Sequence, residues 1–276
     1  MSDYKMISRG NWHGVDYQHV SSKCSKETVH SPHTHNSYEI LLFVRGRAHY
    51  TVEGAKYNLS PMDMMVMRNN ELHNITQYAD AEYERVVINI RLDFFERYGC
   101  EEYRSIFEDR LAGRGNLISS SVINKHKLYD IIKRMEKYND EKGDDAVKSS
   151  CLIELLYLLN KYGKTAEYKK AEINITVEKI INYINENLSE KLSLDEISEK
   201  LFLSKYHLCR VFREHTGYTI NRYVAYKRIL SVKKLCFEGK SLTEASELSG
   251  FESYSNFYKT YTKTMGCSPK EGIFRR

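Results

Sequence analysis

Short runs in which hydrophobic and polar residues alternate fill the first hundred residues. Those at 38–44, 49–52 and 86–90 are rich in β-branched and aromatic side chains, which are typical of strands. Arg45-Gly46-Arg47 and Glu53-Gly54 fall between such runs and predict hairpin tips. Several short strands joined by tight turns predict a small barrel or sandwich.

The hydrophobic period becomes helical after residue 93. Leu128, Ile131, Ile132 and Met135 follow at i, i+3, i+4 and i+7, which places them on one stripe of a helix. A second helix is predicted over 147–162, where apolar residues cover more than one face. Such a helix needs two partners, and either a second subunit or the β domain of its own chain can supply one.

Every strong signal from residue 176 onward is helical. Val177, Ile180, Ile181 and Ile184 form one stripe, and Ser193 is a good N-cap for the following helix. The polar stretch before this region lacks periodicity, and we assign the linker to 166–175.

The C-terminal half contains an internal repeat. Ser193-Leu194-Asp195-Glu196 matches Ser241-Leu242-Thr243-Glu244, and further on Ser204, Leu208, Phe212 and Gly217 match Ser253, Phe257, Tyr261 and Gly266. Each copy predicts a short helix, a break and a longer helix that Ser opens and Gly closes. This is the layout of a helix-turn-helix, whose second helix can lie in a DNA major groove.

Charge separates the two halves of the chain. With 41% hydrophobic and 29% charged residues, the chain can bury a core, which excludes a wholly disordered protein. The formal net charge is +5, and all of it comes from residues 174–276, which hold 17 basic and 12 acidic side chains. A basic half beside a neutral half is typical of nucleic-acid binding. The alternative, a plain helical bundle with a solvated charged face, does not explain two copies in register on the basic stretch.

Three motifs of this half carry a family resemblance. Gly250-Phe251-Glu252-Ser253 with Ser268-Pro269, Leu203-Ser204-Lys205-Tyr206-His207-Leu208, and Arg228-Ile229 resemble the signature of the AraC/XylS transcription regulators. The resemblance implies two helix-turn-helix motifs joined by one long helix, here 220–238, which sets two reading helices in successive major grooves.

The resemblance implies base contacts from Tyr206, Cys209 and Arg210, and from Tyr254, Ser255 and Lys259. Arg210 can reach the acceptor edge of guanine, and Lys259 can do the same or bind phosphate. On the same helices we add Ser204, Lys205, Arg213 and Asn256 as DNA-binding candidates. Ala245-Ser246 and Val232 depart from the residues usual in this family, and the smaller packing at Ala245 predicts a less rigid second motif.

A histidine cluster marks the neutral half. His33-Thr34-His35-Asn36-Ser37-Tyr38-Glu39 with Gly46 resembles the first cupin motif, and Pro61-Met62-Asp63 with His73-Asn74 resembles the second, although it lacks the usual Gly. In an extended strand His33, His35 and Glu39 face the same side. With His73 they form a set able to hold zinc, iron, manganese or nickel.

Three interpretations of this cluster stay open. The first is a sensor pocket that binds a small molecule such as a sugar, and the second is a set of family residues satisfied by their neighbours. The third is a metal-dependent cupin enzyme fused to a DNA-binding domain. We expect no required cofactor, with a divalent metal possible at these four residues.

Together these patterns predict an α+β protein. A cupin-like β-barrel spans 1–93, a helical dimerisation segment 94–165 and an all-α DNA-binding domain 176–276. The six cysteines have no CxxC pair, and no apolar run reaches the ~18 residues that span a bilayer. The predicted protein is a cytoplasmic regulator, not an enzyme, and does not bind membranes. It is expected to be a homodimer that binds double-stranded DNA and an effector, and to contact RNA polymerase if it activates transcription.

Overall fold

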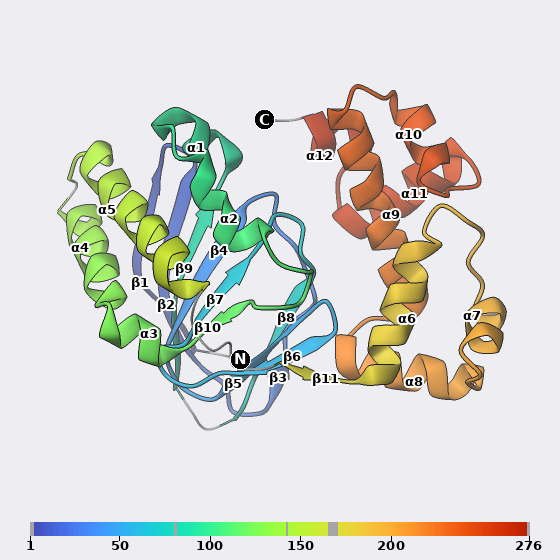
Figure 1. The fold of residues 1–276 in the computed structure, drawn as a ribbon, viewed down its shortest axis with the longest axis horizontal. Helices are drawn as coiled ribbons and strands as arrows, with labels where there is room; N and C mark the ends of the chain where they lie inside the picture. Colours follow the sequence, from blue (N-terminus) through green and yellow to red (C-terminus); the bar gives the residue numbers. More distant parts are fainter. Residues whose placement is uncertain (1–2, 80–81, 142, 165–170, 275–276) are drawn as a thin grey trace. The chain divides into compact units, whose positions relative to one another are not determined.

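The chain forms two compact units in a computed structural model that describes residues 3–79, 82–141, 143–164 and 171–274. Residues 1–172 form the N-terminal domain and 173–276 the C-terminal domain (Figure 1). The predicted α+β class is confirmed, with antiparallel sheets followed by a helical domain. The predicted linker lies partly outside the described residues, because 165–170 are not among them.

The N-terminal domain contains two antiparallel sheets. The first has the order β1 (Asp3–Trp12), β2 (Val15–Lys23), β9 (Glu82–Ile90), β4 (Tyr38–Arg45), β7 (Met64–Met67) and β10 (Leu117–Ile118). The second has the order β11 (Glu172–Ile173), β6 (Ala55–Asn58), β5 (Ala48–Val52), β8 (His73–Gln77) and β3 (Thr28–Val29).

The centre of the first sheet is buried on both faces. Side chains of a strand alternate between faces, so Leu41 and Phe43 of β4 face the second sheet while Ile40 and Leu42 face the helices. All four are at most 1% exposed. β4 therefore shows a continuous apolar run rather than strict alternation.

One of the two predicted hairpin tips is wrong. Glu53-Gly54 does join a hairpin, between β5 and β6, with positive φ at both residues. Arg45-Gly46-Arg47 instead carries the chain from the first sheet to the second. Gly46 has φ +122°, and a Cβ there would lie 2.7 Å from the carbonyl oxygen of Glu82, so this crossing requires glycine.

Helices cover the outer face of the first sheet. They are α1 (Leu92–Tyr98), a 3₁₀ turn (Glu101–Arg104), α2 (Ser105–Glu108), α3 (Ser120–Lys125), α4 (Leu128–Asp140) and α5 (Asp145–Leu158), which continues as π-helix over Leu159–Gly163. The stripe predicted on α4 is buried against this sheet, together with the inner face of α5. The sequence predicts a separate segment over 94–165, but these helices belong to the same compact unit as the sheets.

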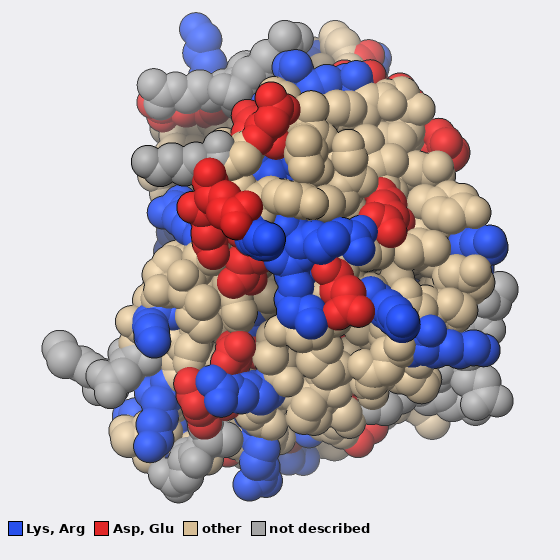
Figure 2. Space-filling model, turned by 90° about the vertical axis from the view of Figure 1, so that its left-hand side faces the viewer, with Lys and Arg blue, Asp and Glu red and all other residues tan. Residues whose placement is uncertain are grey.

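A polar cluster attaches α4 to the sheet. Glu136 of α4 accepts hydrogen bonds from the Tyr17 hydroxyl at 2.5 Å and from His19 Nδ1 at 2.9 Å, and His19 Nε2 contacts Glu84 at 3.0 Å. On the side of the domain where α4 and α5 lie, Lys and Arg alternate with Asp and Glu (Figure 2). Arg134 of α4 pairs there with Glu154 of α5.

The C-terminal domain consists of seven helices within the described residues. They are α6 (Ile175–Glu186), α7 (Leu194–Lys200), α8 (Lys205–Thr216), α9 (Ile220–Phe237), α10 (Leu242–Leu248), α11 (Tyr254–Met265) and α12 (Pro269–Phe274). The predicted repeat is confirmed, since α7 and α8 form the first motif and α10 and α11 the second. The predicted long helix over 220–238 is α9.

The caps of these helices follow the predicted signals. Ser193 forms a capping box with Glu196, and Ser204 and Ser253 cap α8 and α11. Both long helices end at a glycine in the left-handed conformation, Gly217 and Gly266. All six cysteines are free. No helix in the described part of the chain is long and apolar enough to cross a membrane.

Candidate functional site

α8 presents a basic and aromatic face to solvent. Its inner side buries Leu208, Val211 and Phe212, as the sequence predicts. Tyr206 on the outer side is 78% exposed. The other predicted residues of this helix region, Ser204, Lys205, Arg210 and Arg213, are also exposed, and Cys209 is partly buried.

Two cations of this face are paired with carboxylates. Lys205 pairs with Asp195 of α7, and Arg210 contacts Glu214 one turn along α8 at 3.2 Å. All four side chains are about half or more exposed, and exposed ion pairs contribute only about 0–1 kcal/mol. Both cations can therefore leave these carboxylates for a phosphate or a base edge.

α11 repeats this arrangement in the second motif. Phe257 and Tyr261 are fully buried, while Tyr254, Ser255, Asn256 and Lys259 are exposed. The hydroxyl of Ser253 accepts from the Asn256 backbone N–H at 3.2 Å. Asn256 also lines a cavity of about 190 Å³ between the two motifs, which Tyr254, Ser255 and Lys259 do not line.

The two motifs are joined by more than α9. Arg228 of α9 donates from Nε to the carbonyl of Leu188 at 2.9 Å and from Nη2 to that of Glu190 at 2.6 Å. Gly250, in the turn of the second motif, lies against the same segment, since a Cβ there would be 2.6 Å from the Leu188 oxygen. The segment that precedes the first motif is thus held between α9 and the turn of the second motif.

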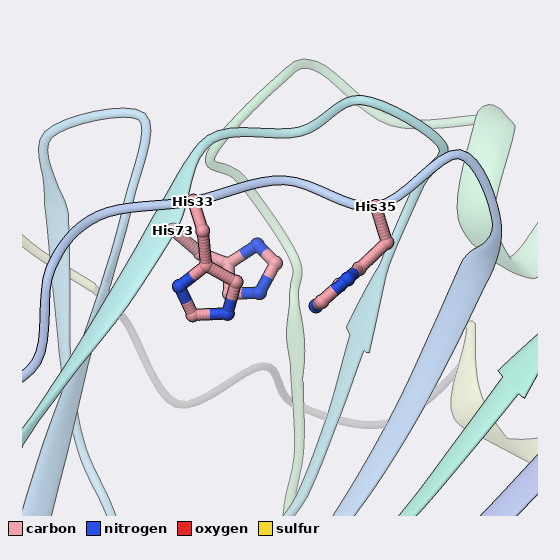
Figure 3. A group of neighbouring side chains, drawn as sticks. All are labelled: His33, His35 and His73. Carbon is pink, nitrogen blue, oxygen red and sulfur yellow. The ribbon is translucent and has the colours of Figure 1, made fainter. Parts of the chain in front are cut away.

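Three histidines of the N-terminal domain converge at one end of the space between the sheets (Figure 3). The ring of His33 lies 5.0 Å from that of His35 and 4.6 Å from that of His73, centroid to centroid. One ligand nitrogen of each histidine lies within 4.8 Å of the others. Glu39 completes the group, with Oε2 3.0 Å from His35 Nε2 and Oε1 3.9 Å from His73 Nε2.

The predicted residues meet, but the predicted strand does not form. His33 and His35 lie in the loop before β4, and only Glu39 lies in that strand. His33 instead forms a single antiparallel bridge with His73, through backbone hydrogen bonds of 2.9 and 3.1 Å. The cluster therefore depends on this bridge rather than on residue parity along one strand.

Burial and charge set the protonation of the cluster. Burial lowers the pKa of His33 to about 4. Burial would raise the pKa of Glu39, but the hydrogen bond with His35 outweighs burial and lowers it to about 2. Burial would lower the pKa of His35, but the hydrogen bond with Glu39 raises it. Glu39 is ionised, and His33 has a free lone pair at neutral pH.

The cluster fits a divalent metal by its donor set. Nδ1 of His33 donates to the Ser31 carbonyl at 3.0 Å, and Nδ1 of His73 donates to that of Glu71 at 2.9 Å. These bonds leave Nε2 of both rings as acceptors, which is how histidine ligands are oriented in metal sites. His73 Nε2 is buried and has no hydrogen-bond partner. The two rings, with His35 and Glu39, would hold the ion.

Sequence reasoning missed a second polar group between the sheets, made of Tyr50, Tyr83 and Arg85. Tyr50 and Tyr83 are at most 3% exposed and hydrogen-bonded to each other. Arg85 of β9 stands two residues from Tyr83 and two from Val87, both in the core between the sheets. Arg85 therefore places a cation on an otherwise apolar face of β9, and this alternation pattern is the sequence signal that could have identified the group.

Two families match this chain. Residues 17–156 match the AraC-like ligand binding domain, and residues 197–273 match the Helix-turn-helix domain. The first match runs from within β2 to within α5, so it leaves out β1 and β11, and the second runs from within α7 to within α12.

Curated proteins are similar to this chain over different lengths. The chain is 24% identical to the "Uncharacterized HTH-type transcriptional regulator YbfI" of Bacillus subtilis, over 81% of this chain and 80% of YbfI. It is 25% identical to the "Probable transcriptional regulator LumQ" of Photobacterium leiognathi, over 86% of this chain and 89% of LumQ. It is 30% identical to the "Multiple antibiotic resistance protein MarA" of Escherichia coli, over 34% of this chain and 76% of MarA.

Proposed function

The chain belongs to the AraC-like family of transcriptional regulators, and on this premise we propose that it activates transcription when a small molecule binds between the sheets of its N-terminal domain. The observation that carries the DNA-binding part is the pair of matched helices α8 and α11. Both are capped by serine and closed by glycine, and both expose cations and tyrosines. Each presents the side chains that read base edges and bind phosphate.

Replacing Arg210 by alanine tests this interface. A preferred site is first selected from random double-stranded DNA with the full chain. We expect Arg210→Ala to weaken binding to that site by roughly 1–3 kcal/mol and to relax the preference at one base pair, because a bidentate contact to guanine is lost. Lys234→Ala, which removes an exposed cation of α9, is the matched control and should leave both unchanged.

Salt dependence supplies the second part of this test. Binding should weaken steeply with salt, since each neutralised phosphate releases counterions. A loss in Arg210→Ala that is equal for all sequences would make Arg210 a phosphate contact. A DNA affinity that does not change with salt concentration contradicts the proposed function. So does a selection from random DNA that yields no preferred site.

Activation follows, in this proposal, from a shift between two populations of the protein. The effector, which the sequence suggests is a sugar, favours one of them and changes which half-sites the protein can span. In this proposal the activator also contacts RNA polymerase, and the protein acts in the cytoplasm.

A homodimer through α5 is part of this proposal. The inner face of α5 packs on its own domain through Leu152, Leu155 and Leu156. Val147 and Tyr157 on its outer face remain 43% and 44% exposed. We expect analytical ultracentrifugation of the full chain to show a dimer that Tyr157→Lys weakens, because an ammonium would be buried there. A wild-type chain that stays monomeric contradicts this proposal.

A second candidate function is a metal-dependent one, supported by the unpartnered Nε2 of His73. A bound ion would supply a Lewis acid between the sheets. Elemental analysis of the purified chain should then find one zinc, iron, manganese or nickel ion per chain, lost in His33→Ala. His49→Ala, which alters a histidine outside the cluster, should keep it. Metal-free wild-type protein after growth in metal-supplemented medium contradicts this candidate.

A further inference from the structure

Arg85 lies inside the N-terminal domain, on the face of β9 that looks toward the second sheet. Its strand neighbours in register are Val20 of β2 and Phe43 of β4. Phe43 is fully buried, and its ring lies 5.6 Å from that of Tyr83. Arg85 as a whole is only partly buried, and its guanidinium lies beside these side chains, with Cζ over the Tyr83 ring, 5.4 Å from the ring centroid.

The guanidinium is poorly satisfied there. Nη1 donates to the Tyr83 hydroxyl at 3.3 Å, a long hydrogen bond, and Nε is buried with no partner. No carboxylate of the described residues forms an ion pair with it within 4.0 Å. Glu39 acts on it through space, but its oxygens contact His35 and His73 instead.

This arrangement costs stability in the protein without a ligand. A guanidinium stays charged in proteins, so it cannot escape burial by losing its proton. An enclosed charge is stable only when it is paired and hydrogen-bonded. A partly buried guanidinium that has no acceptor for Nε and no carboxylate partner among the described residues is therefore expected to gain one from a molecule outside the chain.

We infer that Arg85 binds the carboxylate of a small organic acid, and that this acid is the effector of the proposed regulator. This inference rests on the proposed function, because it names the chemical class of ligand for the same domain. The planar fork of arginine matches the two oxygens of a carboxylate. Leu41, Phe43 and Val87 of the surrounding core would contact its hydrocarbon body.

The charges favour a monocarboxylate over two other classes. A sugar has no charge and would leave the guanidinium unpaired, which revises the sugar suggested by the sequence. A phosphate dianion would bring two negative charges to the one positive charge of Arg85. A single carboxylate matches the one positive charge of Arg85.

Thermal unfolding of the full chain tests this inference with defined probes. The acids are the straight-chain series from acetate to octanoate, together with benzoate and phenylacetate. The comparison compounds are the amide of each acid, D-glucose and D-galactose. At least one acid, at about 100-fold its Kd, is expected to raise Tm by roughly 5–10 °C. Its amide, which has the same shape without the charge, should leave Tm unchanged.

Variants assign this shift to Arg85. Arg85→Gln should lose the shift, and without acid it should melt no lower than the wild type, because a partly buried charge without a carboxylate partner is removed. Arg47→Gln, which alters an exposed arginine, should keep the shift. Arg85→Lys, which keeps the charge, serves as a second variant if Arg85→Gln fails to fold. It should weaken acid binding about tenfold, because one charge-assisted hydrogen bond is lost.

The outcomes separate this inference from the proposed function. No shift with any acid, equal shifts with the amides, or an unchanged shift in Arg85→Gln or Arg85→Lys overturns the inference. If only a sugar raises Tm and changes DNA binding, the inference fails while the regulator stands. If an acid binds through Arg85 but DNA binding never responds to it, the carboxylate site stands and the effector-controlled function fails.

Discussion

Replacing Gly250 by alanine is expected to destabilise the C-terminal domain by about 2–4 kcal/mol and to abolish tight binding to sites that need both motifs. Gly250 has φ +85°, where a Cβ costs roughly 1–2 kcal/mol in the left-handed region. The new Cβ would also lie 2.6 Å from the Leu188 oxygen and 2.9 Å from the Ser189 oxygen. Backbone atoms cannot rotate away, so the turn must move off the segment that Arg228 holds.

Gly239→Ala is the matched control for this substitution. Gly239 also has a positive φ, +93°, but a Cβ there meets nothing within 4 Å. Its cost should be limited to backbone strain of about 1 kcal/mol, and the two motifs should keep their spacing. Urea unfolding of both variants measures the difference in stability. Binding to DNA that carries contact sites for both motifs, compared with DNA that carries a site for one motif, measures the difference in affinity. Equal losses of stability and of DNA affinity in Gly250→Ala and Gly239→Ala would show that contact with Leu188 does not set the arrangement of the motifs.

Replacing Glu71 by alanine is expected to cost the N-terminal domain about 3–5 kcal/mol, because it leaves buried Arg110 without its counter-ion. The Glu71 side chain is fully buried. Its oxygens accept from Arg110 Nη2 at 2.6 Å and Nη1 at 2.9 Å, and from the backbone N–H of Gly113 at 2.8 Å. Asn116 Nδ2 donates to it as well, at 3.0 Å. The carboxylate therefore ties the segment after α2 to the sheets.

Glu154→Ala provides the comparison, since Glu154 also pairs with an arginine but is 47% exposed. Its loss should cost less than about 1 kcal/mol. Chemical unfolding of the N-terminal transition, followed by circular dichroism, separates the two effects. A cost for Glu71→Ala as small as that for Glu154→Ala would mean that Arg110 finds another acceptor.

Local signals explain why the C-terminal domain was predictable. Ser204 and Ser253 bond to N–H groups only three residues ahead, and Gly217 and Gly266 close the same helices. Such contacts depend on neighbours in sequence, so they can be recognised before the fold is known. The repeat then strengthens each signal by presenting it twice.

Long-range contacts explain what sequence reasoning missed in the N-terminal domain. The sequence around Gly46 predicts a hairpin tip. In the structure Gly46 approaches Glu82 closely, at the point where the chain crosses from one sheet to the other. His33 meets His73 through a bridge across 40 residues, which no alternation along one strand could show. The role of Arg85 depends on Tyr50 and Tyr83, which lie on different sheets.

The sequence by itself determined that the chain has a two-motif helical domain carrying the excess positive charge, because caps, stripes and charge are properties of neighbouring residues. It also determined that His33, His35, Glu39 and His73 belong together, through their resemblance to known motifs. Only the tertiary structure decided how the motifs are held against each other and that Arg85 has no carboxylate partner among the described residues. Both depend on backbone and side-chain atoms that are far apart in sequence and meet only when the sheets and helices pack.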